Sequence, residues 1–290
     1  MTAPLIHADG QILAAVDASS YAASIAEHAA WAAVRLEAPL RILHCIERVA
    51  TAMPLDLSGN LVLGGQEQLL ANMAELDQQH AKLAQQRGRL LLDQVMARAS
   101  ESGVSKAESL LRHGDLVDTL LELEPESRLM VIGKRGEHAD FAKGHLGSKL
   151  ERVIRAVHRP VLVASRAFRP IQRFMIAFDG SPTTRRCVDL VCASPLLKGL
   201  DCQLLAVGDG AALREAVQSA ETQLRGAGFK PASQVLSGAA DAVIAHQVAE
   251  LQIDLLVMGA YGHSRIRSMI VGSTTTQVLR GCPIPVLLLR

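Results

Sequence analysis

Aromatic side chains are scarce in this sequence. Only 3% of its 290 residues are Phe, Trp or Tyr, whereas 49% are hydrophobic, so Ala, Val, Ile and Leu supply most of the apolar mass. This composition disfavours an aromatic-rich β-sandwich and favours helices packed on a buried parallel sheet. No apolar run reaches the roughly 18 residues that a membrane helix needs. The first ten residues also lack the basic flank and apolar stretch of a secretory signal. We therefore expect a cytoplasmic protein without a membrane partner.

The sequence also lacks a large net charge and an even set of cysteines. The formal net charge is +1, which disfavours a nucleic-acid partner. The cysteines are odd in number and have no metal-ligand spacing, so we expect reduced, buried thiols. They are Cys45, Cys187, Cys192, Cys202 and Cys282. The length is sufficient for about two ordinary domains.

An internal repeat divides the chain into two halves. The segments QILAAVD, at 11–17, and QRFMIAFD, at 172–179, are apolar runs that end in Asp17 and Asp179, and a helical pattern follows each. Farther along each half come LMVIGKRG and LLVMGAYG, then a Gly-Ser pair and a Pro-Val-Leu run at a constant offset. Such self-similarity indicates a duplicated structural unit. We predict two tandem α/β domains, 1–167 and 168–290.

Strands and helices alternate along the second half. Strands are expected near 173–178, 202–207, 232–236, 254–258 and 285–289. Helices are expected near 182–193, 211–226, 239–250 and 273–280. This alternation predicts a Rossmann-like parallel sheet with right-handed crossovers.

The first half contains additional residues within about 47–103. Leu69, Leu76, Leu83 and Leu90 recur every seven residues, with Met73 between them. This pattern predicts a long helix near 66–100. The simpler hypothesis is that the helix packs on the sheet, and the alternative is that it covers a ligand cavity.

A glycine-rich loop in the second half has the features of a phosphate site. Gly259 directly follows an expected strand, Gly262 comes soon after, and nine residues later Gly272 and Ser273 open a helix. Glycines let main-chain amides approach a ligand closely. A helix start adds unpaired N–H groups and a partial positive charge. The hydroxyls of Ser273 and Thr274 could bond a phosphate oxygen or a metal-bound water.

Further polar residues belong to the same expected crevice. Ligands of such sheets bind beyond the carboxyl ends of the strands, where Asp179 could accept hydrogen bonds from a ribose. His263 and Arg265 either contact phosphate or keep an exposed loop soluble. The alternative is that the glycines only form a tight turn and that Asp17 and Asp179 only cap helices.

The pattern G-x2-G-x9-G-[ST], between a strand and a final helix followed by Pro-Val-Leu, resembles the universal stress protein family over nearly the whole chain. The resemblance implies that each half is a five-stranded parallel sheet of order 3-2-1-4-5 with helices on both faces. It implies a site for ATP or a related adenine nucleotide, with or without Mg²⁺. By similarity, that site would consist of Asp179, Val207 against the adenine, Gly259, Gly262, Gly272, Ser273 and Thr274. It also implies that the halves pair through their last strands, 161–165 and 285–289.

The first half departs from this pattern. Gly133-Lys134-Arg135-Gly136 is followed by ten residues rather than nine before the Gly-Ser pair, and Ala18 stands where the second half has Gly180. The extra residue and the basic pair put nucleotide binding there in doubt. The expected degenerate site consists of Asp17, Gly133, Gly136, Gly147 and Ser148.

Two other motifs have simpler interpretations. Gly208-Asp209-Gly210 follows a strand and opens a helix, but Leu213 stands where a dinucleotide fingerprint needs glycine, so we interpret it as a turn. A P-loop motif is absent from the sequence. A loop metal site remains an alternative to a solvated loop for Glu137, His138, Asp140 and His145.

The leading hypothesis is a stress-response protein that binds ATP or a related nucleotide in its second half and regulates an unidentified protein partner. One alternative is a slow ATPase or a nucleotide-transferring enzyme, although the loop has no P-loop lysine and no obvious carboxylate to orient water. Another is a nucleotide-free module whose long helix and first half bind a protein or an apolar ligand.

Overall fold

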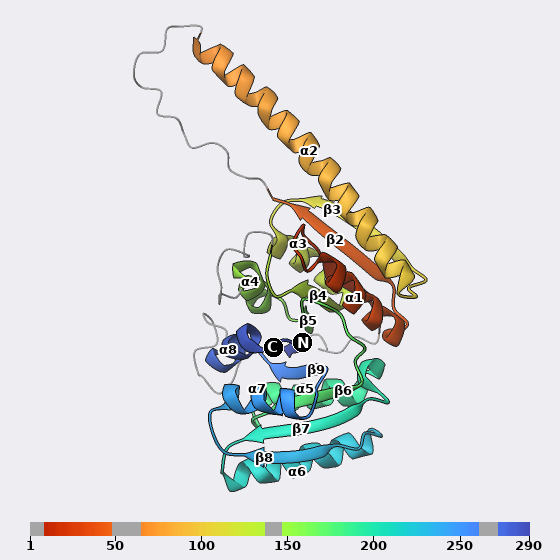
Figure 1. The fold of residues 1–290 in the computed structure, drawn as a ribbon, viewed down its shortest axis with the longest axis vertical. Coiled ribbons are helices and arrows are strands. Elements are labelled where there is room, and N and C mark those ends of the chain that lie inside the picture. The colour runs from red at the N-terminus through yellow and green to blue at the C-terminus, as the bar shows by residue number, and fades with distance from the viewer. Residues whose placement is uncertain (1–8, 48–64, 137–146, 261–271) are drawn as a thin grey trace.

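The computed structural model describes residues 9–47, 65–136, 147–260 and 272–290, in which ten strands form one sheet (Figure 1). The first half contains β1 (Gln11–Ala15), α1 (Ala22–Leu36), β2 (Leu40–Ile46), α2 (Gly65–Glu101), β3 (Ala107–His113), α3 (Leu116–Leu123), η1 (Glu124–Glu126), β4 (Ser127–Gly133), α4 (Ser148–Ala156) and β5 (Val161–Ala164). The second half contains β6 (Arg173–Phe178), α5 (Pro182–Ala193), η3 (Pro195–Leu197), β7 (Asp201–Val207), α6 (Ala211–Gly226), β8 (Ala232–Leu236), α7 (Ala240–Glu250), β9 (Leu255–Gly259), α8 (Ser273–Gly281) and β10 (Val286–Leu289).

The sheet has the order β3-β2-β1-β4-β5-β10-β9-β6-β7-β8. Within each half the strands are parallel, and the order 3-2-1-4-5 expected from the family resemblance is confirmed. The halves meet where β5 pairs with β10 in antiparallel orientation, with Val163 opposite Val286 and Val161 opposite Leu288. Two five-stranded sheets therefore continue as one.

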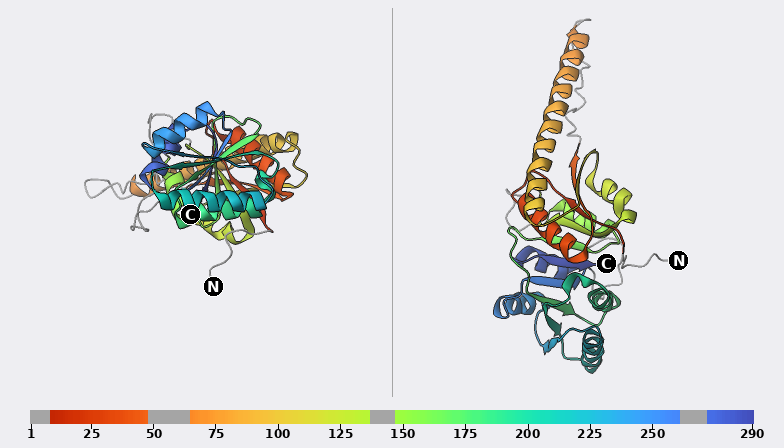
Figure 2. Two further views of the ribbon diagram at one scale, coloured as in Figure 1. Left: turned by 90° about the horizontal axis from the view of Figure 1, so that it is seen from below. Right: turned by 90° about the vertical axis from the view of Figure 1, so that its right-hand side faces the viewer.

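Helices cover both faces of this sheet (Figure 2). Successive strand residues point to opposite faces, so Ile12 and Ala14 face one core while Leu13 and Ala15 face the other. The first core contains residues of α1, α2, α5 and α6, and the second contains residues of α3, α4, α7 and α8. Because both faces are covered, the strands are continuously apolar rather than alternating. Each core includes residues from both halves.

Helix α2 packs on the sheet only through its C-terminal part. Its buried residues there are Gly88, Leu92, Val95 and Ala99. A Cβ atom on Gly88 would lie 2.9 Å from side-chain atoms of both His44 and Leu111, so the helix lies close against β2 and β3. The N-terminal part extends beyond the sheet (Figure 1).

The heptad leucines do not face the sheet. Leu76, Leu83 and Leu90 are 52%, 50% and 63% exposed. The predicted helix is present and packs on the sheet through its C-terminal part, but not through the leucines whose spacing predicted it. The packed stripe is the opposite side of the helix, which carries small and apolar residues.

None of the helices in the described ranges combines the length and the apolar composition needed to span a membrane.

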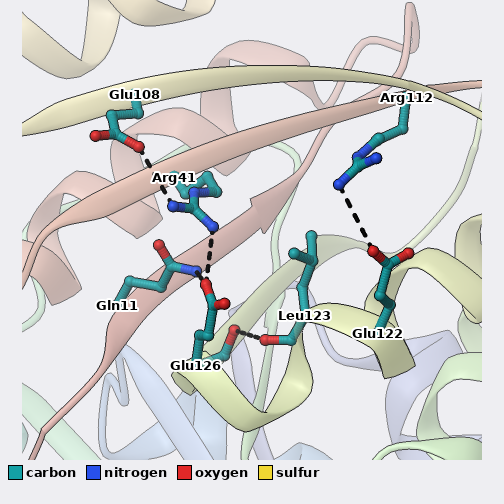
Figure 3. A network of polar contacts seen from close by, with 8 residues as sticks. Gln11, Arg41, Glu108, Arg112, Glu122, Leu123 and Glu126 are labelled. Atoms are coloured by element: carbon teal, nitrogen blue, oxygen red, sulfur yellow. Dashed lines mark hydrogen bonds and ion pairs between the residues drawn. The ribbon is translucent and has the colours of Figure 1, made fainter.

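A network of ion pairs and hydrogen bonds connects residues at the amino-terminal ends of strands in the first half (Figure 3). Arg41, on β2, forms ion pairs with Glu108 at 3.4 Å and with Glu126 at 3.1 Å. Gln11 donates a hydrogen bond to the same Glu126 carboxylate at 3.5 Å. Arg41 and Glu108 lie at the amino-terminal ends of their strands, so this network lies at the sheet edge opposite the expected ligand crevice.

Candidate functional site

The loop after the first strand of each half is organised by its aspartate. Asp179 follows β6, is half-buried, and accepts hydrogen bonds through Oδ1 from the amide of Ser181 at 2.9 Å and the hydroxyl of Thr184 at 2.8 Å. Asp17 accepts the equivalent bond from the amide of Ser19 at 3.1 Å. Each carboxylate therefore fixes the turn that leads into the following helix and stands at the carboxyl edge of the sheet.

The described ends of the loop between the fourth strand and the last helix are joined by the same hydrogen bond in both halves. The amide of Gly147 donates to the carbonyl of Lys134, and the amide of Gly272 donates to the carbonyl of Ala260, both at 3.4 Å. These glycines are the N-caps of α4 and α8, and neither helix has a side-chain cap. The first-turn amides of a helix have no partner within the helix. The hydroxyl of Thr275 adds a bond to the carbonyl of Gly259 at 3.1 Å.

The first half shows how the predicted residues converge. A Cβ atom on Gly136 would lie 2.9 Å from Oδ2 of Asp17, so this glycine allows the loop to lie against the carboxylate. A Cβ atom on Gly147 would lie 3.3 Å from the carbonyl oxygen of Lys134. Gly133 has a packing role, because its Cβ would lie 3.1 Å from atoms of Tyr21. The exposed Ser148 follows at the start of α4.

In the second half the predicted residues lie on neighbouring strand ends. Strand β6 lies between β7 and β9, so Asp179, Val207 and Gly259 occupy three adjacent positions at the carboxyl edge. Val207 is half-buried. At the start of α8, Ser273 is exposed and Thr274 is half-buried. The predicted residues Gly262, His263 and Arg265 lie outside the described residues.

Two ion pairs connect α4 to other carboxyl-edge segments of the first half. Lys149 pairs with Glu47, which follows β2, at 2.8 Å. Arg152 pairs with Asp115, the N-cap of α3, at 3.0 Å. Partial burial opposes ionisation of Asp115, but hydrogen bonds from Arg152 and from main-chain amides hold its pKa below the usual value. These four residues were not identified from the sequence.

The second half carries different residues at the matching positions. When the sequences of the two halves are aligned on their aspartates and Gly-Ser pairs, Thr274 corresponds to Lys149 and Gln277 corresponds to Arg152. Neither side chain is charged, so neither can form the ion pairs of the first half. Asp209, which corresponds to Glu47, instead accepts a hydrogen bond from Ser237. The described residues at the carboxyl edges of the two halves therefore differ in charge at these positions.

The side chain of Lys134 is directed from the first half into the second. Its side chain is only 8% exposed, and Nζ donates to the carbonyl oxygens of Cys282 and Ile284, the latter at 3.1 Å. Burial lowers the pKa of this ammonium group. The charge of Lys134 is therefore directed toward main-chain carbonyls of the second half, and the doubt about nucleotide binding in the first half stays a prediction.

Other candidate chemistry can be placed as well. All five cysteines are free, and burial raises the pKa of the Cys202 thiol to about 12. Cys45 and Cys192 are half-buried rather than buried. The residues considered for a loop metal site, Glu137, His138, Asp140 and His145, lie outside the described residues. The glycine motif after β7 forms a turn in which Gly208 has φ +145° and Gly210 is the N-cap of α6.

Comparisons with known proteins agree with this architecture. The model of the universal stress protein family matches residues 10–165 and again residues 170–290. A universal stress protein from Synechocystis sp. is 36% identical over 284 residues, which cover 96% of this chain and 99% of the relative. The crystal structure of a universal stress protein from Archaeoglobus fulgidus has a TM-score of 0.72 at 18% identity and covers 99% of this chain and 98% of that one.

A smaller solved structure, a universal stress protein in complex with cAMP, matches 41% of this chain and 96% of its own, at 23% identity and a TM-score of 0.36. The two family matches together span nearly all of the chain, and the repeat seen in the sequence coincides with them. The chain therefore belongs to the universal stress protein family, whose pattern occurs twice along it.

Proposed function

We propose that the second half binds an adenine nucleotide such as ATP and that the chain acts through this binding as a regulator rather than as a catalyst. The observation that carries the proposal is the difference between α4 and α8. Both helices start at an uncapped glycine held over the end of the preceding strand. Charged residues of α4 pair with Glu47 and Asp115, whereas α8 has uncharged residues at those positions.

The residues of the second half suit the parts of a nucleotide. Phosphate oxygens would accept hydrogen bonds from the first-turn amides of α8 and from the hydroxyls of Ser273 and Thr274. A Mg²⁺ ion, where present, would be held mainly by the phosphates. The adenine would lie against Val207. The ribose would donate to the carboxylate of Asp179, which stands at the carboxyl end of β6 and also accepts hydrogen bonds from Ser181 and Thr184.

A matched pair of glycine variants tests the site. Gly272→Val places a branched side chain at the start of α8, and Gly147→Val places the same side chain at the start of α4. Both glycines have negative φ, −53° and −59°, so valine introduces no left-handed strain at either position. We expect Gly272→Val to weaken ATP binding at least about tenfold in calorimetry, because it blocks the approach to the amides. Gly147→Val should bind ATP like the parent.

Equal ATP affinity for the parent and Gly272→Val would contradict the site assignment. Mass spectrometry of the native protein, in which bound nucleotides are identified by mass, provides an independent measurement. A parent that neither co-purifies with a nucleotide nor binds ATP, cAMP or AMP in calorimetry would refute the proposed function itself.

Asp179 requires a conservative variant because it also holds the turn before α5. Asp179→Ala would remove the acceptor for Ser181 and Thr184, and lost binding could then reflect a displaced loop. Asp179→Asn keeps one acceptor oxygen and removes the charge. We expect it to weaken ATP binding about tenfold, because a ribose hydroxyl loses a charged acceptor, with little change in the melting temperature. Asp17→Asn is the matched control in the first half, and an effect of equal size there would place the ligand elsewhere.

A further inference from the structure

The exposed large apolar side chains of the described residues gather on one helix. Four of them, Leu70, Leu76, Leu83 and Leu90, lie on α2, while only Val34 and Leu121 lie on other elements. Leu76, Leu83 and Leu90 are seven residues apart, so they share one side of the helix. That side is opposite the side that packs on the sheet through Gly88, Leu92, Val95 and Ala99. The leucine stripe therefore faces away from the body of its own chain.

The charges of α2 change sign along the helix. Its N-terminal part carries Glu75 and Asp77, and the following part carries Lys82, Arg87 and Arg89. All five side chains are exposed. The segment 75–89 is complementary to itself when reversed, because its acidic part then faces the basic part of the other copy. In a parallel, in-register pair, each charge would face its own copy and be repelled.

We propose that α2 pairs with α2 of a second copy of this chain in an antiparallel coiled coil. One register satisfies both the leucines and the charges. It places Leu76 opposite Leu83, and its twofold axis passes between Gln79 and His80. Glu75 and Lys82 are seven residues apart and lie on the same side of the stripe, so this register brings Glu75 of each chain beside Lys82 of the other. The charge reversal selects a second copy of the chain as the occupant of the stripe.

The shape of the molecule accommodates this pairing. The N-terminal part of α2 extends beyond the sheet in Figure 1 and in the right-hand view of Figure 2, so a second helix can lie along its outer side without meeting its own sheet. Residues 70–90 span about 30 Å at 1.5 Å per residue. Polar residues such as Gln79, His80 and Gln86 lie between the leucines, and polar seam positions weaken a coiled coil while fixing its register. The dimer should therefore dissociate on dilution.

Sedimentation equilibrium of the full chain tests the pairing. We expect a monomer–dimer equilibrium for the parent at micromolar concentrations. Leu76→Glu with Leu83→Glu should weaken dimerisation at least about a hundredfold, since four charges would enter the seam. Leu121→Glu, at an exposed leucine of α3, is the control and should dimerise like the parent. Circular dichroism checks that α2 remains helical in each variant.

A parent that stays monomeric at about 100 μM, or that forms the same dimer with both leucines replaced, would overturn the proposal. The register has its own test. Lys82→Asp should weaken the dimer, and adding Glu75→Lys to it should restore the parent affinity within about threefold, because the opposite charges then face each other again. A double variant no tighter than Lys82→Asp alone would overturn the antiparallel register.

Discussion

At the scale of single residues, His28 is a titratable group that is fully buried in α1. It is 0% exposed within α1, its Nδ1 lies 2.7 Å from the carbonyl oxygen of Ser24, and its ring meets that of Phe168 edge-on at 5.0 Å. Within the described ranges, its Nε2 has no hydrogen-bond partner. Burial lowers the pKa of His28 to about 4, although the bond to Ser24 opposes this shift and the charge of Lys134 adds to it.

This lowered pKa predicts a loss of stability in mild acid. The unfolded chain binds the proton below the ordinary pKa of 6.5, whereas the folded chain resists it until about pH 4. The free energy of unfolding therefore keeps its full value above about pH 6.5. It decreases by about 3 kcal/mol in total as the pH falls toward 4. Urea unfolding at several pH values measures this decline. His28→Phe should show a decline smaller by roughly that amount, and identical pH profiles for parent and variant would contradict the prediction.

The sequence could predict site residues only where the local pattern determines the position. Aspartate or glycine directly after an apolar run marks a strand end, so Asp17, Asp179 and Gly259 were placed correctly at the carboxyl edge. Glu47 and Lys149 could not be paired in advance, because they are far apart in the chain and the pair forms only when β2 and α4 come together. The contact of Lys134 with the second half could not be predicted for the same reason, because the carbonyls that its Nζ meets are far away in the sequence.

At the scale of elements, α4 and α8 are equivalent helices with different first turns. If the ion pairs of α4 obstruct the first crevice, removing them should open it. We expect Lys149→Thr with Arg152→Gln to raise the number of ATP molecules bound per chain in calorimetry from one to two. Exposed ion pairs contribute at most about 1 kcal/mol each, so the fold should be retained. A stoichiometry that stays at one would instead implicate the extra residue in the first loop.

Helix α2 illustrates what periodicity can and cannot predict. The seven-residue spacing of leucines predicted the helix near 66–100, and the structure has it at Gly65–Glu101. Periodicity groups residues onto one face, but it does not say which face meets the sheet. The packed face contains Gly88 and Ala99, whose small size allows the helix to approach β2 and β3. Which face of α2 packs on the sheet depends on the space above the strands, and the spacing of the leucines gives no information about that space.

At the scale of the whole molecule, the fold class followed from the repeat and from the alternation of strands and helices. The strand order within each half came from the family resemblance rather than from residue patterns. The antiparallel register of β5 and β10, by contrast, depends on how the two halves approach each other. Contacts such as those from Lys134 to Cys282 and from Arg290 to Arg155 accompany that approach, and no short motif predicts them.

This joined sheet predicts that the two halves unfold together. Strands β5 and β10 pair directly, and the core on each face of the sheet contains residues from both halves, so unfolding one half would expose apolar surface of the other. We expect a single calorimetric transition whose van't Hoff enthalpy equals the measured enthalpy. Leu162→Asp, a charge placed opposite Leu287 at the junction, should lower the melting temperature and preserve the single transition, since both halves depend on that strand pair. Two resolved transitions in the parent would show that the halves are independently stable and that the continuous sheet adds little to either.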